Sequence, residues 1–144
     1  MSHEPLELTI ITKELANSPR RGDIVRFMLE KDGLLWTKRV VGLPGETIEI
    51  RSPYVLINGK ELLDPPFFEK ISSYEDGYAG YVDVKSMGLE GIALPITLGH
   101  DEYFLMGDNS ANSVDSRMFG PVPREAIQEK IIRIVFPPWR IREL

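Results

Sequence analysis

Apolar and polar residues alternate with a period of two along most of this chain, whereas the period of an amphipathic helix is scarce. Such alternation places successive side chains on opposite faces of a strand. The clearest case is Tyr54–Ile57 followed by Asn58-Gly59, because Asn-Gly suits the tight turn of a β-hairpin that continues into residues 60–63. The other predicted strands are residues 8–13, 24–29, 34–41, 47–50, 104–106 and 131–136. We therefore predict a mainly β fold, as a coiled antiparallel sheet or a partly closed barrel.

The alternation weakens between residues 64 and 101, where the pattern is typical of loops with one short hairpin. This predicts an insertion of about residues 64–101 on the β core. Residues 123–130 begin with a proline and predict one short helix. A length of 144 residues fits one domain, so residues 1–144 are expected to form a single domain that includes the insertion.

Composition narrows the possible functions. The net charge is −5 and no cluster of Lys and Arg stands out, so nucleic acid is not an expected partner. The absence of cysteine excludes disulfides and thiol catalysis. Only His3 and His100 could supply an imidazole, and His100 lies in a predicted loop, so no metal site is expected. No apolar run reaches the roughly 18 residues that would cross a bilayer, and no signal peptide opens the chain.

Small polar residues crowd the stretch that follows the predicted strand at Phe104–Met106. Such a cluster at a strand end builds either a functional site or a hydrogen-bonded turn, and the pattern alone leaves both open. A calcium loop that starts at Asp108 is excluded, because its sixth position would be Ser113 instead of glycine and its twelfth Phe119 instead of glutamate. The chain also lacks the Gly-Lys-Ser/Thr of a phosphate-binding loop.

Lys38 lies within the predicted strand 34–41, on the same face as Trp36 and Val40, while Arg39 points to the other face. Apolar neighbours on its own face disfavour the charged form of a lysine and lower its pKa. A general base near neutral pH needs a pKa of roughly 7–8. Lys38 is therefore either such a base or a lysine whose amine extends into solvent at the sheet edge.

Three segments resemble, in this order, the conserved boxes of the type I signal peptidases, which are serine–lysine endopeptidases. The first is Arg21–Val25, and the second is Lys38–Gly45 followed by the acidic Glu46. The third box is matched at each of its fixed positions, by Gly107, Asp108, Asn109, Ser113, Asp115, Ser116 and Arg117. With the Pro-Pro-Trp sequence near the C-terminus, the resemblance covers about residues 19–138.

The resemblance implies a role for each matched residue. Lys38 stands at the place of the general base, and Ser113 at the place of a serine that orients that base. Asp115 with Arg117, and Asp108 with Arg39, stand where the family forms supporting ion pairs. Because Arg39 faces away from Lys38, it can hold a carboxylate without that charge raising the pKa of the base.

The nucleophile is where this sequence departs from the family. The family has a Ser-Met-x-Pro-Thr-Leu box upstream, whereas this chain has Ser2-His3-Glu4-Pro5-Leu6. Ser2 is the candidate nucleophile, although methionine and threonine are missing and the spacing to the next box is several residues short. Ser18 is a weaker candidate. The chain as written is therefore expected to have little or no peptidase activity.

By resemblance, the expected function is cleavage of signal peptides from exported preproteins after small residues, through an acyl-enzyme and without a metal or cofactor. The expected location is the extracytoplasmic face of the cell membrane, with a membrane surface as a further partner. An N-terminal anchor helix of the family is expected to be absent from this chain. The alternative is a catalytically inactive binding or assembly module on the same β scaffold, which the altered serine box favours and the retained Lys38 and Ser113 disfavour.

Overall fold

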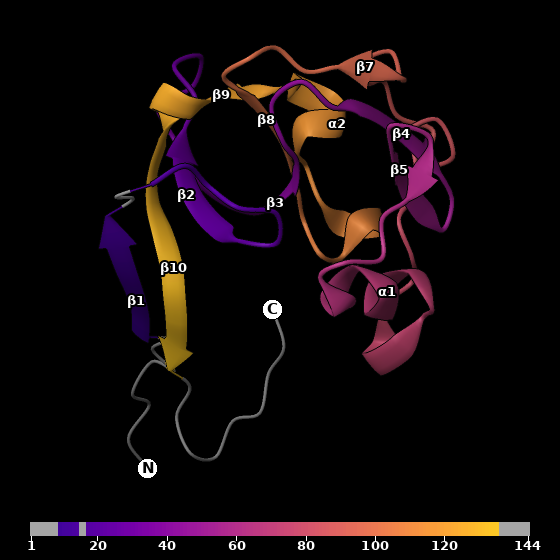
Figure 1. Ribbon diagram of the computed structural model, residues 1–144, viewed down its shortest axis with the longest axis horizontal. Helices are drawn as coiled ribbons and strands as arrows, with labels where there is room; N and C mark the ends of the chain where they lie inside the picture. The colour runs from indigo at the N-terminus through magenta and orange to yellow at the C-terminus, as the bar shows by residue number, and fades with distance from the viewer. Residues whose placement is uncertain (1–8, 15–16, 136–144) are drawn as a thin grey trace.

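The computed structural model describes residues 9–14 and 17–135, which form two antiparallel sheets and a few short helices (Figure 1). The six-stranded sheet has the order β1-β10-β2-β3-β8-β9, and the four-stranded sheet has the order β6-β5-β4-β7. The first contains β1 (Thr9–Glu14), β2 (Ile24–Met28), β3 (Leu35–Gly42), β8 (Glu102–Met106), β9 (Val122–Pro123) and β10 (Ile127–Val135). The second contains β4 (Thr47–Arg51), β5 (Tyr54–Ile57), β6 (Lys60–Glu61) and β7 (Ile96–Thr97). The mainly β prediction is confirmed, as two sheets rather than a closed barrel in the described part of the chain.

The predicted strands agree with the observed ones to within a few residues at each end. Asn58 and Gly59 have φ values of 51° and 83°, the positive values that the predicted hairpin turn requires. Two-residue alternation located these strands because each buries one face, as β2 does with Val25 and Phe27.

Two predictions in the less regular parts of the chain are wrong. The segment 64–101 contains the helix α1 (Pro66–Ser72) and a short 3-10 turn, whereas the predicted hairpin is absent from it. The helix is too short for a visible period, but Phe68 and Ile71 lie one turn apart and are fully buried. The predicted helix at 123–130 is a single 3-10 turn, Arg124–Ala126, after which β10 begins at Ile127. Pairing of β10 with both β1 and β2 outweighs the helix-start signal of Pro123.

β3 and β8 form a wall shared by two hydrophobic cores. On one face, Val41 and Phe104 pack with residues of β4, β5 and α1. On the other face, Val40 and Leu105 pack with residues of β2 and β10. Each fully buried side chain of this kind contributes roughly 1.5–3 kcal/mol to folding. Both faces of β3 are packed at Val40 and Val41, which fixes the strand in place. Because side chains alternate along a strand, Lys38 and Arg39 are thereby held on opposite faces of β3.

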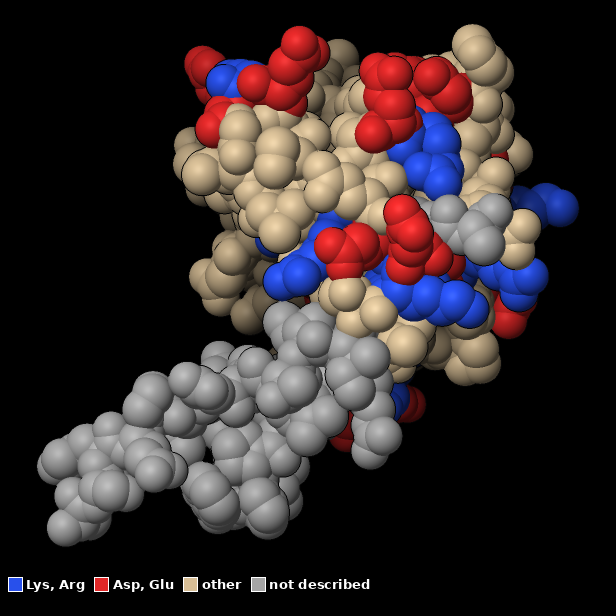
Figure 2. Space-filling model, turned by 90° about the vertical axis from the view of Figure 1, so that its left-hand side faces the viewer, with Lys and Arg blue, Asp and Glu red and all other residues tan. Residues whose placement is uncertain are grey.

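The face formed by β1 and β10 mixes positive and negative side chains instead of collecting one sign (Figure 2). On β10, Lys130 pairs with Asp23 at 3.0 Å. Among the described residues, no helix is long and apolar enough to span a membrane. The same residues contain no group of three or more His, Cys, Asp or Glu that could hold a metal ion.

Candidate active site

The site forms where β3 runs antiparallel to β8. Arg39 pairs in register with Met106. Because the two strands are antiparallel, the polar stretch that begins after Met106 lies beside Lys38. Lys38 Nζ donates a hydrogen bond to Ser113 Oγ at 3.0 Å, although the two residues are 75 positions apart in sequence. The neighbourhood predicted for Lys38 and Ser113 is therefore present, and their catalytic roles stay a prediction.

Lys38 is half-buried, and this position shifts its titration. Burial lowers the pKa of the Lys38 ammonium below its usual value, and the charge of Arg117 lowers it further. The carboxylates of Asp115 and Asp108 act in the opposite direction without cancelling the effect of burial. The expectation that the carboxylate held by Arg39 would not raise the pKa of Lys38 is therefore wrong. The shift is in the direction that a general base near neutral pH requires.

Behind Ser113 lies an ion pair that is wholly buried, Asp115 with Arg117, whose side chains are both 0% exposed. Asp115 accepts hydrogen bonds from Arg117 Nε at 2.8 Å and Nη2 at 3.0 Å, and from Ser113 Oγ at 2.8 Å. A buried charge is tolerated only when it is paired and hydrogen-bonded, and here both charges are. The predicted Asp115–Arg117 contact is present.

Arg117 is held by the protein on its other side as well. Its Nη1 donates to Val82 O at 2.7 Å and to Ser110 Oγ at 3.0 Å, and its Nη2 donates to Ser113 O at 3.0 Å. Val82 belongs to the 64–101 segment, so that segment supports the buried ion pair directly. A short helix, α2 (Ser116–Phe119), carries Arg117 and is capped at its start by the Asp115 carboxylate.

The second predicted pair, Arg39 with Asp108, is also present. It is bidentate, with Nε to Oδ1 at 2.8 Å and Nη2 to Oδ2 at 2.9 Å, and its side chains are 13% and 10% exposed. Arg39 further donates to Gly22 O at 2.8 Å, and its guanidinium lies 3.8 Å above the centre of the Phe67 ring. The pair thus fixes the strand on the side opposite Lys38.

A third pair, between Arg21 and Glu46, braces the turn that follows β3. Arg21 binds both carboxylate oxygens of Glu46, at 2.7 and 2.6 Å. Burial alone would raise the pKa of Glu46, but the hydrogen bonds from Arg21 and from the Leu43 amide lower it below its usual value. Arg21 of the first box and Glu46, which follows the second, therefore form an ion pair that holds these two segments together.

An open cavity of about 210 Å³ lies beside Lys38, with Thr37, Asp108, Asn112 and Ser113 among the residues that line it. Gly107 is required at its edge, because a Cβ there would lie 2.6 Å from Ser113 Cβ and 3.4 Å from Lys38 Nζ. Such a cavity admits a small side chain next to the lysine amine.

The sequence reasoning missed three residues that support this site. Ser110 is buried inside the third box, and its hydroxyl also accepts from the Val82 amide at 3.1 Å. Phe67 stacks on Arg39, and Tyr81 is buried near both Asp108 and Arg39. Burial and the charge of Asp108 raise the pKa of the Tyr81 hydroxyl. The only signal for Phe67 and Tyr81 was aromatic density in a segment otherwise typical of loops.

Neither nucleophile candidate is brought to Lys38 in the described part of the chain. Ser2 lies outside the described residues. Ser18 lines a different cavity, together with Lys13 and Lys130, and none of the residues that line the cavity beside Lys38 takes part in it. Ser18 therefore has no geometric support as the nucleophile.

Comparison with known proteins adds independent evidence. A family model described as signal peptidase, peptidase S26, matches residues 3–136. Signal peptidase I P of Bacillus subtilis subsp. natto is 34% identical over 119 residues, which cover 82% of this chain and 60% of that protein. Signal peptidase I of Leptolyngbya laminosa is 32% identical over 136 residues, which cover 89% of this chain and 58% of that protein. The chain thus spans a little over half the length of these curated relatives.

The fold has a counterpart among solved structures. The crystal structure of a signal peptidase I from Enterococcus faecalis V583 matches with a TM-score of 0.60 and 31% sequence identity. The match covers 81% of this chain and 98% of that one. The likeness therefore extends over nearly all of the solved chain and most of this one.

Proposed function

Because this chain belongs to the peptidase S26 family of signal peptidases, we propose that it is a serine endopeptidase that uses Lys38 as its general base. Its substrates are signal peptides of exported preproteins, cleaved after small residues. The observation that carries the proposal is the hydrogen bond from Lys38 Nζ to Ser113 Oγ at 3.0 Å, in a half-buried position that lowers the pKa of the lysine. A binding module would need neither feature.

The reaction runs in two steps around the Lys38 amine. A serine hydroxyl gives its proton to Lys38 Nζ while its oxygen attacks the scissile carbonyl carbon. The carbon–nitrogen bond then breaks, and the leaving amine takes the proton from Lys38, which leaves an acyl-enzyme. A water molecule next gives its proton to Lys38 and attacks the ester, and the serine oxygen recovers that proton on release. No metal or cofactor takes part.

Ser113 serves as the orienting residue. Its hydroxyl is fixed between Lys38 and Asp115, so it holds the lysine amine toward the cavity of about 210 Å³. The preference for small side chains such as those of an Ala-x-Ala site rests on membership of the signal peptidase family. The substrate enters as an extended strand, the usual way in which a peptide adds to a β-sheet.

The nucleophile is a serine from the N-terminal region, and Ser2 is its candidate in this sequence. Residues 1–144 act as one signal-peptidase-like catalytic domain in which the 64–101 segment is an insertion. Its place of work is the extracytoplasmic face of the cell membrane, where exported preproteins emerge and where the membrane surface is a partner.

Cleavage of a peptide with an Ala-x-Ala site tests the proposal in the parent chain, Lys38→Ala and Ser2→Ala. Because Ser2 is unusually close to the next box, we expect turnover of residues 1–144 to be very slow or absent. Measurable turnover that both substitutions abolish would assign Ser2 as the nucleophile. Turnover lost only in Lys38→Ala would point to another serine, and turnover that survives Lys38→Ala would contradict the proposal.

Binding decides the matter when no turnover is measured. We expect the Ala-x-Ala peptide to shift the amide NMR signals of Gly107 and Ser113, and a matched peptide with Trp-x-Trp not to do so. Equal binding of both peptides, or no shift with either, would contradict a substrate site beside Lys38.

A further inference from the structure

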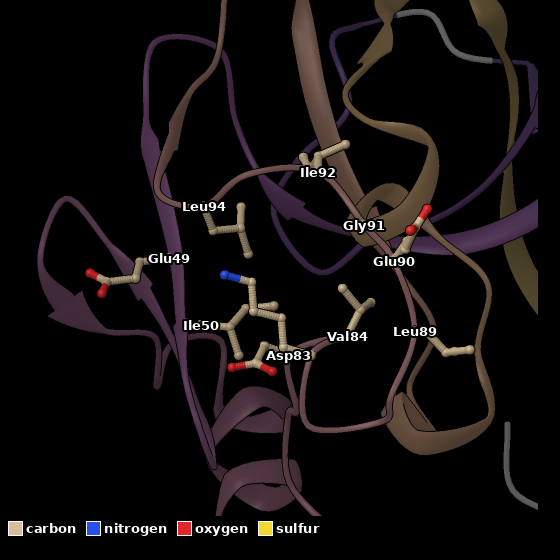
Figure 3. Close-up of a pocket in the computed structure, with 10 residues that line it drawn as sticks. Glu49, Ile50, Asp83, Val84, Leu89, Glu90, Gly91, Ile92 and Leu94 are labelled. Carbon is tan, nitrogen blue, oxygen red and sulfur yellow. The ribbon is translucent and has the colours of Figure 1, made fainter.

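A second and larger cavity, of about 440 Å³, is lined by residues other than those around Lys38 (Figure 3). One wall is β4, through Glu49 and Ile50, and the other is the segment 83–94. The two cavities share no lining residue. Its volume lies within the roughly 300–1,000 Å³ usual for ligand sites.

The β4 wall of this cavity is an open sheet edge. β7 pairs only with Thr47 and Ile48 of β4, and the chain before β7 contains Pro95, which has no amide hydrogen to donate. Beyond Ile48, no strand in the described part of the chain therefore pairs with this side of β4. An unpaired edge is the place where an extended peptide can add as a further strand.

The register indicates which backbone groups face the cavity. Leu98 N donates to Glu46 O on this side, and Asn58 N donates to Thr47 O on the β5 side. Hydrogen-bonded positions recur every second residue in an antiparallel pair, so the amide and carbonyl of Ile50 point toward the cavity. In the described segment 83–95, no backbone group bonds to either of them. Both groups can therefore bind an incoming strand.

The side chains around the cavity set the chemistry of its occupant. Ile50, Val84, Ile92 and Leu94 supply apolar surface, and Leu89, which is 50% exposed, lies at the rim. The charged lining residues are Glu49, Asp83 and Glu90 against a single Lys85, a net charge of −2. Glu49 is partly compensated by the exposed Arg51 at 3.4 Å, and Asp83 accepts hydrogen bonds from Ser86. No ion pair of Glu90 occurs among the described residues.

We propose that this cavity is a second peptide-binding site, which takes an extended segment carrying an apolar side chain next to Lys or Arg as an added strand on β4. The backbone of the segment pairs with Ile50, its apolar side chain packs on Ile92 and Leu94, and its cationic side chain lies near Glu90. This site stands apart from the proposed peptidase reaction and does not depend on it.

The wall of the second site formed by Gly91 and Ile92 contacts Arg117, which supports the residues around Lys38. Ile92 N donates to Arg117 O at 2.9 Å, and a Cβ on Gly91 would lie 2.5 Å from the same oxygen. Arg117 in turn holds Asp115, which accepts from Ser113. A peptide bound between β4 and Gly91 therefore packs against the segment that positions the residues around Lys38.

The test is titration of the ¹⁵N-labelled chain with the peptide acetyl-Thr-Leu-Lys-Val-Lys-Thr-amide. We expect saturable shifts of the Ile50, Gly91 and Ile92 amides, and none with the peptide in which both lysines are replaced by glutamate. Replacing the valine by proline, which cannot donate a hydrogen bond to β4 from near the middle of the peptide, should abolish binding. Shifts centred on Lys38 and Ser113, equal binding of the lysine and glutamate peptides, or no binding would each overturn the proposal.

Charge variants complete the experiment. Glu90→Lys should weaken binding of the lysine peptide by roughly fivefold or more, because it reverses one charge at the rim. Glu61→Lys is the matched control, since Glu61 is an exposed acid on β6, at the opposite edge of the same sheet. Lys38→Ala should bind as the parent does. Equal weakening by Glu90→Lys and Glu61→Lys would show only a general charge effect and would overturn the site. The same conclusion would follow if the Ile50, Gly91 and Ile92 amides shifted with protein concentration alone, because the cavity would then bind a second copy of this chain.

Discussion

Asp115→Asn is the most informative single change, because it keeps the shape of the side chain and removes one charge from a wholly buried pair. Asp115 accepts five hydrogen bonds. Its Oδ1 receives the Arg117 amide and Nε, and its Oδ2 receives Gly107 N, Ser113 Oγ and Arg117 Nη2. Every neighbour of the carboxylate is thus a donor, so the amide group of an asparagine must face donors whichever way it is turned.

The cost follows from this geometry. Arg117 would remain charged and 0% exposed, with only uncharged acceptors left around it. Breaking a buried ion pair on one side costs about 3–5 kcal/mol. For a chain of this length that corresponds to a fall in Tm of roughly 12–20 °C. The pKa of Lys38 should fall further as well, because the carboxylate that raises it is gone while Arg117 still lowers it.

Urea denaturation measures the change in unfolding free energy, and ¹⁵N NMR of the lysine amine measures the pKa. Asp76→Asn is the matched control, since Asp76 pairs with Lys70 at 2.7 Å but is 49% exposed, and such pairs contribute at most about 1 kcal/mol. A loss in Asp115→Asn no larger than in Asp76→Asn would refute the reasoning. A rise in the pKa of Lys38 would refute the electrostatic part alone.

Three further changes test other parts of the site. Arg39→Ala should cost about 3–5 kcal/mol of unfolding free energy, because Asp108 would keep a mostly buried charge; an unchanged Tm would contradict this. The pKa of Lys38 is lowered from 10.5 in the folded chain. Between that lowered pKa and about 10.5, the unfolded chain therefore binds more protons than the folded chain. The free energy of unfolding should consequently rise with pH across this window. Lys38→Met should remove that rise, which urea titrations at several pH values would measure. Ser110→Ala should lower the free energy of unfolding by about 1–3 kcal/mol, because Arg117 Nη1 loses an acceptor. Ser110→Thr keeps a hydroxyl and should show a smaller loss in the same urea titration.

The strand period predicted part of the arrangement around Lys38, whereas the partners of Lys38 and Arg39 came from the resemblance to the signal peptidases, and the catalytic roles stay predictions. Alternation along residues 34–41 put Lys38 and Arg39 on opposite faces, and the structure pairs them with Ser113 and Asp108. The Asn58-Gly59 turn was equally readable, because its positive φ values depend on local chemistry alone.

The prediction failed where tertiary contacts decide local structure. α1 is held in the core by Phe68 and Ile71. A helix of seven residues is too short to show a clear helical period in its sequence, so it could not be predicted from the pattern. The proline at position 123 predicted a helix over residues 123–130, but residues 129–131 lie between two strands that both supply ladder partners. The support given by Val82 to Arg117 could not be read either, because it is a backbone carbonyl and any residue could provide it.

The direction of the hydrogen bonds explains why a buried arginine matters to a lysine that it does not touch. The single proton of the Ser113 hydroxyl goes to Asp115, so the hydroxyl can only accept from Lys38. A neutral lysine amine that donates one N–H to Ser113 retains a lone pair for another partner, whereas an ammonium has none. Which form is present depends on the pKa of Lys38, which burial lowers and the Asp115 carboxylate raises. By pairing with that carboxylate and adding its own positive charge, Arg117 shifts the balance toward the neutral amine, the form that can accept a proton.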